Sequence, residues 1–199
     1  MFTGIVEGTG TVRSVVRRGD VTAVRIDVGG LFEGLPLGGS VAINGCCLTA
    51  VRSDASGFDV DLTGETLQRT RFGERLVPGA VVNLERPMRA DGRFDGHVVQ
   101  GHVDGVGQVL ELRSLGESAE IRVQAPPELA RYLVEKGSVA VDGISLTAYG
   151  IADGAFSVAL IPYTLQVTNL RDARPGSLVN LEADVIAKYV ERLLAARGL

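Results

Sequence analysis

Alternation of apolar and polar residues dominates the first half of the chain. Within 24–28, Val24, Ile26 and Val28 alternate with charged residues, which is the period of a strand with one buried face. Further segments rich in Val, Ile and Thr follow, separated by turns that contain glycine. The predicted strands are 11–17, 21–28, 40–43, 48–52 and 58–62. About six strands in about 90 residues predict a small closed barrel, because closure removes exposed sheet edges.

Two segments have a helical pattern instead. Segment 127–135 begins with Pro127 and is followed by Gly137, which are the residue types that favour helix starts and ends. Segment 183–197 carries an apolar stripe at helical spacing, formed by Ile186, Tyr189, Val190, Leu193 and Leu194. This last helix either packs on its own barrel or bundles with copies from other subunits, and the pattern leaves both open.

The two halves of the chain repeat each other. Gly4 aligns with Gly101 and Gly45 with Gly143, which are offsets of 97 and 98 residues. Four blocks recur in the same order: 4–10 with 101–107, 40–50 with 138–148, 58–70 with 156–168, and 78–85 with 175–182. Gly45 and Gly143 fall between strands, where a tight turn requires positive φ. The sequence therefore predicts two copies of one β module followed by a single helix.

Composition and charge exclude several classes of protein. A net charge of -4 and a pI near 5.3 provide no basic surface for nucleic acid. The chain has no run of about 18 apolar residues and no secretory signal, so we expect no membrane segment and a soluble cytoplasmic protein. Cys46 and Cys47 are adjacent, which disfavours a disulfide between them, and no cluster has zinc-ligand spacing. We therefore expect no metal.

The positions where the halves differ are the candidates for chemistry, since shared Gly, Leu and Thr residues maintain the fold. The differing pairs are Cys47 and Ser145, Ile5 and His102, Gly38 and Lys136, and Pro87 and Asp184. Each also has a structural interpretation. Cys47 suits a small buried site, Ser145 a turn, Lys136 the surface and Asp184 the first turn of a helix.

The two histidines are His97 and His102, in the segment 96–103. On an extended chain they lie on opposite faces, so they do not easily share one metal. His97 is interpreted as structural, whereas His102 is favoured because it lies in a repeated block. No phosphate-binding glycine loop is present. Hydroxyl groups suited to a neutral polyol and a ring edge are supplied by Thr49, Thr66, Ser145, Thr147 and Thr164.

Six blocks in order resemble the riboflavin synthase family. They are 1–6, 44–49, 65–67, 96–103, 142–147 and 161–165, and the resemblance spans residues 1–196. It implies an all-β fold of two tandem six-stranded Greek-key barrels, at 1–94 and 95–184, and a C-terminal trimerisation helix at 185–199. It also implies an enzyme without a cofactor. That enzyme transfers four carbons between two molecules of 6,7-dimethyl-8-ribityllumazine, giving riboflavin and 5-amino-6-ribitylamino-pyrimidinedione. The alternative is a non-catalytic lumazine- or flavin-binding protein.

The resemblance further implies that the site lies between barrels of two subunits in a homotrimer, and it allows association with lumazine synthase. Substrate positions carried to the first barrel are Gly4, Ile5, Val6, Cys47, Leu48, Thr49, Asp61, Leu62, Thr63, Gly64, Glu65 and Thr66. Those carried to the second barrel are Gly101, His102, Val103, Lys136, Ser145, Leu146, Thr147, Ile161, Pro162, Tyr163, Thr164, Leu165 and Gln166.

Catalytic roles are assigned as hypotheses on the same basis. His102 and Ser145 exchange protons with one ring methyl, and Lys136 stabilises negative charge. Cys47 contacts the group that adds to the acceptor ring, and Asp184 and Phe2 complete the interface. A water molecule or a ribityl hydroxyl is an alternative nucleophile.

Overall fold

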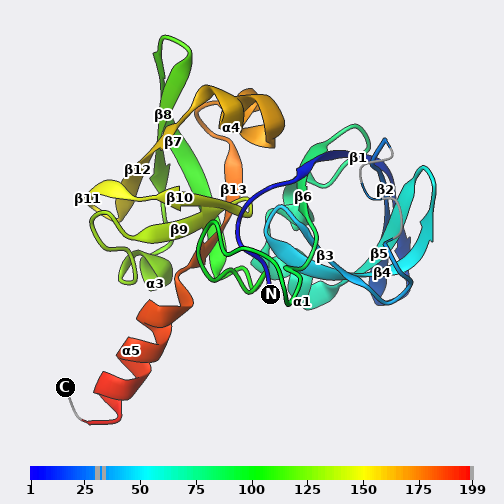
Figure 1. Cartoon of the computed structure of the whole chain (residues 1–199), viewed down its shortest axis with the longest axis horizontal. Helices are drawn as coiled ribbons and strands as arrows, with labels where there is room; N and C mark the ends of the chain where they lie inside the picture. The colour runs from blue at the N-terminus through cyan, green and yellow to red at the C-terminus, as the bar shows by residue number, and fades with distance from the viewer. Residues whose placement is uncertain (30–31, 33–34, 198–199) are drawn as a thin grey trace.

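Two β units stand side by side in the computed structural model, and one helix extends away from them (Figure 1). The structure describes residues 1–29, 32 and 35–197. The N-terminal half of the chain builds one unit and the C-terminal half builds the other. Each unit has its own apolar core. The predicted duplication of one module is therefore confirmed at the level of the fold.

The first unit is a closed six-stranded barrel. Its strands are β1 (Gly8–Arg18), β2 (Val21–Asp27), β3 (Ser40–Ile43), β4 (Cys46–Asp54), β5 (Gly57–Thr63) and β6 (Val81–Glu85). They pair in the Greek-key order β1-β2-β5-β4-β3-β6, and β6 pairs with β1 to close the barrel. Val24 and Ile26 point into the core, as their alternation predicts, and meet Phe58 there. Helices α1 (Gly64–Arg69) and α2 (Phe72–Arg75) lie between β5 and β6.

The second unit repeats this order in a curled seven-stranded sheet. Its strands are β7 (Gly105–Leu115), β8 (Ser118–Gln124), β9 (Ser138–Val141), β10 (Ile144–Thr147), β11 (Tyr149–Ala152), β12 (Ala155–Leu160) and β13 (Leu178–Ala183). β10 and β11 together correspond to the single strand β4. The break between them falls at Ala148, whereas Gly150, at φ 58°, lies within β11 where the register against β12 is irregular. The sheet order is therefore β10-β9-β13-β7-β8-β12-β11.

The remaining helices are short, apart from the last. They are α3 (Pro127–Ala130), α4 (Pro162–Val167), the 3-10 helix η1 (Asn169–Asp172) and α5 (Val185–Ala195). The predicted helix 127–135 is wrong in its length, because the chain leaves α3 through tight turns. In these turns the amide of Leu133 donates to the carbonyl of Ala130, and that of Gly137 to Val134.

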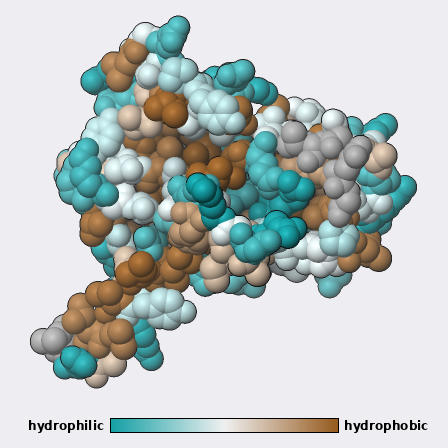
Figure 2. Space-filling view, viewed as in Figure 1, coloured by the Kyte–Doolittle hydropathy of each residue, from teal (hydrophilic) through white to brown (hydrophobic). Residues whose placement is uncertain are grey.

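Helix α5 presents its apolar stripe to solvent. The exposed fractions are 61% for Ile186, 64% for Tyr189 and 67% for Leu193. Figure 2 shows hydrophobic residues along this projecting helix. The stripe is therefore not covered by the barrel of its own chain. No helix among the described residues combines the length and apolar character needed to span a bilayer.

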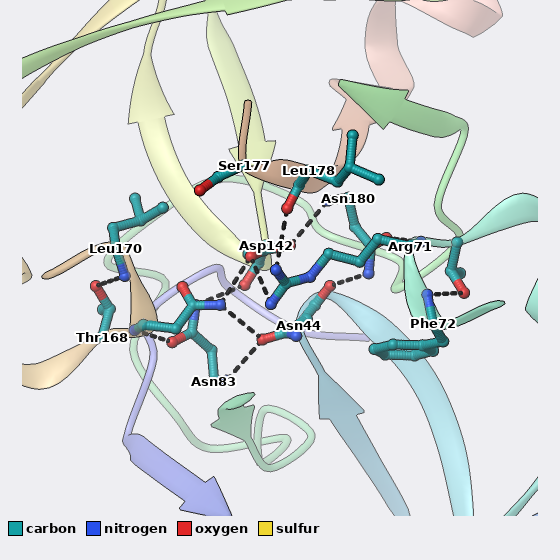
Figure 3. A network of polar contacts seen from close by, with 12 residues as sticks. Asn44, Arg71, Phe72, Asn83, Asp142, Thr168, Leu170, Ser177, Leu178 and Asn180 are labelled. Carbon is teal, nitrogen blue, oxygen red and sulfur yellow. Dashed lines mark hydrogen bonds and ion pairs between the residues drawn. The ribbon is translucent and has the colours of Figure 1, made fainter. Parts of the chain in front are cut away.

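The two barrels meet across a polar interface with local two-fold character (Figure 3). The side chain of Asn83 donates to the carbonyl of Asp142, and that of Asn180 donates to the carbonyl of Asn44, each at 2.9 Å. The turns at Gly45 and Gly143 lie back to back, because a Cβ built on either would approach the other's backbone nitrogen to 2.7 or 2.6 Å. Equivalent residues of the two halves therefore make reciprocal contacts.

One ion pair breaks this local symmetry. Asp142 is buried, and its Oδ2 lies 3.1 Å from a guanidinium nitrogen of Arg71. Their counterparts, at an offset of 98, are the neutral Asn44 and Asn169, whose side chains hydrogen-bond to each other at 3.1 Å. The side chain of Asn169 also donates to Asp142, at 2.7 Å. The interface therefore holds one buried charge pair rather than two.

Candidate active site

The segments that precede β1 and β7 lie against each other between the two barrels. The amide of Phe2 donates to the carbonyl of Val99 at 2.7 Å, and the amide of Val99 donates back at 3.1 Å. Phe2 is fully buried in a small apolar cluster with Val99, Ala42 and Ala140, and Cys47 packs against this cluster. Phe2 therefore fixes both segments rather than facing solvent.

Each of these segments contacts the barrel of the other half. The amide of Ser145 donates to the carbonyl of Gly4 at 2.8 Å, and the amide of Cys47 donates to the carbonyl of Gly101 at 2.8 Å. Val6 packs against the core of the second barrel, whereas Val103 packs against the core of the first.

This crossing corrects the grouping predicted from the repeat. That prediction placed Gly4, Ile5 and Val6 in the first-barrel site, and it placed 101–103 in the second. The structure exchanges them. Both glycines are required at the crossing, since a Cβ on Gly4 would lie 2.6 Å from that of Ser145 and one on Gly101 would lie 2.6 Å from that of Cys47. Both also have positive φ, at 76° and 81°.

A cavity of about 410 Å³ opens beside Cys47 on the outside of the first barrel, a volume within the range of small-molecule sites. It is lined by Cys46, Cys47, Glu65, Thr66, Arg69, Thr70, Gly101, His102, Val103 and Asp104. The structure therefore brings together Cys47, Thr66 and His102, which the sequence proposed for different barrels. We call this cavity the first-barrel pocket.

The two adjacent thiols have different environments. Cys46 is buried, and this burial raises the pKa of its thiol to about 12, so the group is a neutral thiol at physiological pH. Cys47 is half-buried and reaches the first-barrel pocket. The opposite orientations follow from strand geometry, because successive side chains of β4 point to opposite faces.

Ser145 occupies the equivalent place on the second barrel and has a partner that Cys47 lacks. Its Oγ lies 2.7 Å from Nδ1 of His97. His97 is buried, and burial lowers the pKa of its imidazole, while the charge of Asp184 acts in the opposite direction. The ring is therefore neutral at pH 7. Its Nε2 has no hydrogen-bond partner among the described residues.

Sequence reasoning missed His97, which it interpreted as structural. The repeat comparison offered no signal, because His97 lies outside the four repeated blocks, and the nearest of these in the second half begins at Gly101. The proximity of His97 to Ser145 arises only from the pairing of the two crossing segments, in which the amide of His97 donates to the carbonyl of Thr3 at 3.1 Å. His97 is thus an asymmetric addition to the second site.

Lys136 and Asp184 lie apart from the first-barrel pocket. The ammonium of Lys136 is 4.8 Å from the ring centroid of Tyr149, and Lys136 itself is exposed. Asp184 caps α5, where its carboxylate accepts a hydrogen bond from the amide of Ile186 at 2.9 Å. The structural interpretation of Asp184 is therefore correct, although its charge also acts on His97.

The other predicted substrate positions divide by burial. The side chains of Leu48 and Leu62 belong to the first-barrel core, so a substrate contact at these two positions would have to use their backbone groups. Exposed or partly exposed positions on the first barrel are Thr49, Asp61, Thr63, Gly64 and Glu65, and Ile5 is exposed on the segment that crosses to the second barrel. Those of the second barrel are Leu146, Thr147, Ile161, Pro162, Tyr163, Thr164, Leu165 and Gln166. Within the part of the chain that the structure describes, no group of three or more His, Cys, Asp or Glu side chains is arranged to hold a metal ion.

Comparison with known proteins identifies the repeated module. The model of the lumazine binding domain matches residues 3–87 and again 100–184. A riboflavin synthase from Actinobacillus pleuropneumoniae is 43% identical over 194 residues, covering 98% of this chain and 90% of that protein. One from Mycobacterium tuberculosis is 45% identical over 204 residues and covers both chains fully. One from Bacillus subtilis is 41% identical over 194 residues, covering 98% of this chain and 90% of that protein.

Solved structures have the same two-barrel architecture. The crystal structure of LumP complexed with riboflavin superposes with a TM-score of 0.84 at 27% identity, covering 92% of this chain and 99% of LumP. The structure of LumP complexed with 6,7-dimethyl-8-(1'-D-ribityl) lumazine superposes with a TM-score of 0.83 at 25% identity, with the same coverage.

Proposed function

The chain belongs to the riboflavin synthase family, and we propose that its two barrels carry out that family's reaction as a pair, each binding one molecule of 6,7-dimethyl-8-ribityllumazine. The enzyme transfers a four-carbon unit from one lumazine to the other. The products are riboflavin and 5-amino-6-ribitylamino-pyrimidinedione. The observation that carries the proposal is the pair of equivalent sites at Cys47 and Ser145, each completed by the crossing segment of the other half.

Two identical substrates in unlike roles require two similar sites with unlike chemistry. Cys47 brings a thiol to the first site, whereas Ser145 brings a hydroxyl that is paired with a neutral imidazole. A buried ring nitrogen beside a serine hydroxyl suits proton exchange with the acidic ring methyl. We propose that Ser145 and His97 serve one substrate, and that Cys47 and His102 serve the other. We further propose that Lys136 stabilises the negative charge that develops on the substrate during the reaction.

Positioning supplies much of the rate in this proposal. Holding two reacting rings in contact removes a bimolecular entropy term that is worth about 7–11 kcal/mol in well-oriented systems. Among the residues that the structure describes, those that line the first-barrel pocket lie within 46–104, and neither Ser145 nor His97 of the second site is one of them. This separation supports a reaction between sites of different subunits.

The uncovered apolar stripe of α5 supports a homotrimer that joins such sites. In this proposal Phe2 and Asp184 lie near the interface between subunits, and the trimerisation helix is α5, within the predicted segment 185–199, of which 198–199 lie outside the described residues. Cytoplasmic location and association with lumazine synthase stay predictions.

A non-catalytic lumazine- or flavin-binding protein is the second candidate, favoured by the structural similarity to LumP at 25–27% identity. The riboflavin synthases are more similar in sequence, at 41–45% identity. The enzyme is therefore the better supported function.

Incubation of the protein with the lumazine alone separates the two. The enzyme is expected to form one riboflavin for every two lumazines consumed, measured by chromatography with fluorescence detection. Tight binding of lumazine without any riboflavin over many hours would overturn the catalytic proposal. A Ser145→Ala variant provides the matched test of the second site and is expected to keep lumazine binding while turning over at least tenfold more slowly.

A further inference from the structure

Two buried carboxylates occupy equivalent places in the two barrels, outside the groups assigned to chemistry above. Glu85 ends β6 and is 5% exposed, and Glu182 lies near the end of β13 and is 2% exposed. They correspond at the offset of 97. A buried carboxylate is unfavourable unless it is hydrogen-bonded, so the partners of each indicate what it does.

Glu85 binds the N-terminal crossing segment. Its Oε1 accepts hydrogen bonds from the amide of Thr3 at 2.6 Å and from the hydroxyl of the same residue at 2.8 Å. Its Oε2 accepts from the amide of Gly4 at 3.1 Å. Both oxygens are thus used, and both hold backbone that lies directly against Ser145.

Glu182 binds the second crossing segment in the same way. Its Oε1 accepts from the amide of Gln100 at 2.7 Å, and its Oε2 accepts from the amide of Gly101 at 2.9 Å. Gly101 then accepts the amide of Cys47, and 101–103 form a wall of the first-barrel pocket. The carboxylate therefore acts on that pocket through one residue.

We propose that Glu85 and Glu182 are positioning residues, and that each sets the substrate site on the barrel to which it does not belong. Glu182 is part of the second barrel, yet the backbone that it holds walls the site at Cys47. Glu85 is part of the first barrel, yet its partner segment lies against Ser145. The two sites of the proposed reaction are therefore set by crossed contacts, and the inference rests on that proposed function.

The surroundings of the carboxylates agree with a positioning role. Burial raises the pKa of both, and that of Glu182 reaches about 7, although its backbone donors and Lys188 favour the ionised form. The charged groups that act on Glu182 are Lys188 of α5 and Asp104, whose carboxylate lies 2.6 Å from the Lys188 ammonium. Above pH 7 Glu182 therefore carries a charge that burial disfavours, at the place where the amides of Gln100 and Gly101 need an acceptor.

Substitutions of glutamate by glutamine test the inference. Glutamine has the same shape, but it turns one of the two acceptors into a donor that opposes a backbone N–H. The full-length chain is titrated with riboflavin, and the amide resonances of Cys47 and Thr49 report the first site while those of Ser145 and Thr147 report the second. Glu117→Gln, in the exposed turn between β7 and β8, is the matched control.

Glu182→Gln is expected to weaken riboflavin binding about tenfold at Cys47 and Thr49, the loss expected for a charge-assisted hydrogen bond, and to leave Ser145 and Thr147 within about twofold. Glu85→Gln is expected to do the reverse. The inference would be overturned if either variant weakened riboflavin binding equally at both sites or only at the site on its own barrel. It would also be overturned if neither variant weakened binding. If a glutamine variant does not fold, Glu182→Asp and Glu85→Asp replace it. Aspartate keeps the charge but moves the carboxylate away from the backbone amides, and the same binding measurements and expected outcomes apply. Binding is the readout, so an unsubstituted chain that binds riboflavin but forms none from lumazine counts against the proposed function alone.

Discussion

At the scale of single residues, comparison of the two halves identified some of the side chains that the structure brings together at the candidate sites and did not identify others. It singled out Cys47 and Ser145, which occupy equivalent places in the structure. It overlooked His97, which lies outside the four repeated blocks. It also grouped Gly4 and Gly101 each with the barrel of its own half. An alignment follows the order of residues along the chain, whereas the contact of each segment with the opposite barrel depends on the three-dimensional arrangement.

The buried ion pair between the barrels leads to a stability prediction. Asp142→Ala leaves the Arg71 guanidinium, whose side chain is 17% exposed, without its charged partner and removes an acceptor from the amide of Asn180. We expect the free energy of unfolding to fall by about 3–5 kcal/mol, measured by urea titration. Asp172→Ala, which removes a surface partner of Arg171, is expected to change it by less than about 1 kcal/mol. Similar losses for both variants would contradict the interpretation of Asp142.

Glu182 leads to a prediction on pH. The pKa of its carboxyl rises from 4.5 to about 7 on folding because of burial, so the folded chain holds this proton more tightly than the unfolded chain does. The resulting stabilisation is fully present below pH 4.5 and is lost as pH rises through 7. Glu182→Gln has no such proton. Relative to the unsubstituted chain, its free energy of unfolding is expected to rise by about 2–3 kcal/mol between pH 5 and pH 8.

The measurement is urea unfolding of both proteins at the two pH values. Because Glu85 is present in both, its own contribution cancels in the difference. A difference that stays constant with pH would show that the Glu182 proton is held equally in the folded and unfolded chains. Riboflavin affinity at the first-barrel pocket of the unsubstituted chain is expected to increase from pH 5 to pH 8. The reason is that only the ionised Glu182 carboxylate accepts hydrogen bonds from both backbone amides.

At the scale of elements, periodicity was informative wherever one face of a strand or helix packs against a core. The strands of the first half follow the alternation of apolar residues, and β2 has the expected burial pattern. The segment 127–135 was overestimated, because Leu129 and Leu133 are both buried in an arrangement of successive turns that helical spacing does not distinguish. The interruption between β10 and β11 falls at Ala148, which the sequence pattern does not distinguish from the equivalent Ala50 inside the continuous strand β4.

Helix α5 carries a prediction at this scale. The double substitution Ile186→Glu and Leu193→Glu places charge in the exposed stripe, which we propose is the contact between subunits. The unsubstituted protein is expected to sediment as three copies of the 21.0 kDa chain, and the variant as one. Arg192→Gln, on the polar side of the helix, is the control and is expected to keep the assembly. A variant that retains the full mass would exclude the stripe as the contact.

At the scale of the whole molecule, the fold was predictable from the duplication, whereas the relation between the copies was not. The repeat predicted two modules, and the family model matches both. Nothing in either module alone indicates that Asn83 and Asn180 meet the opposite turn, since each partner lies in the other half of the chain. Polar groups at such an interface are satisfied only after both barrels have folded.

The crossing of the two segments bears on the history of the chain. A gene duplication normally releases one copy from selection, so that it can decay or be lost. In the proposed function each half of this chain supplies a wall of the other half's site, and a half on its own would have to take that wall from a second molecule. A mutation that displaces the crossing segment of one half would therefore impair the proposed site on the other barrel, so selection would act on both copies.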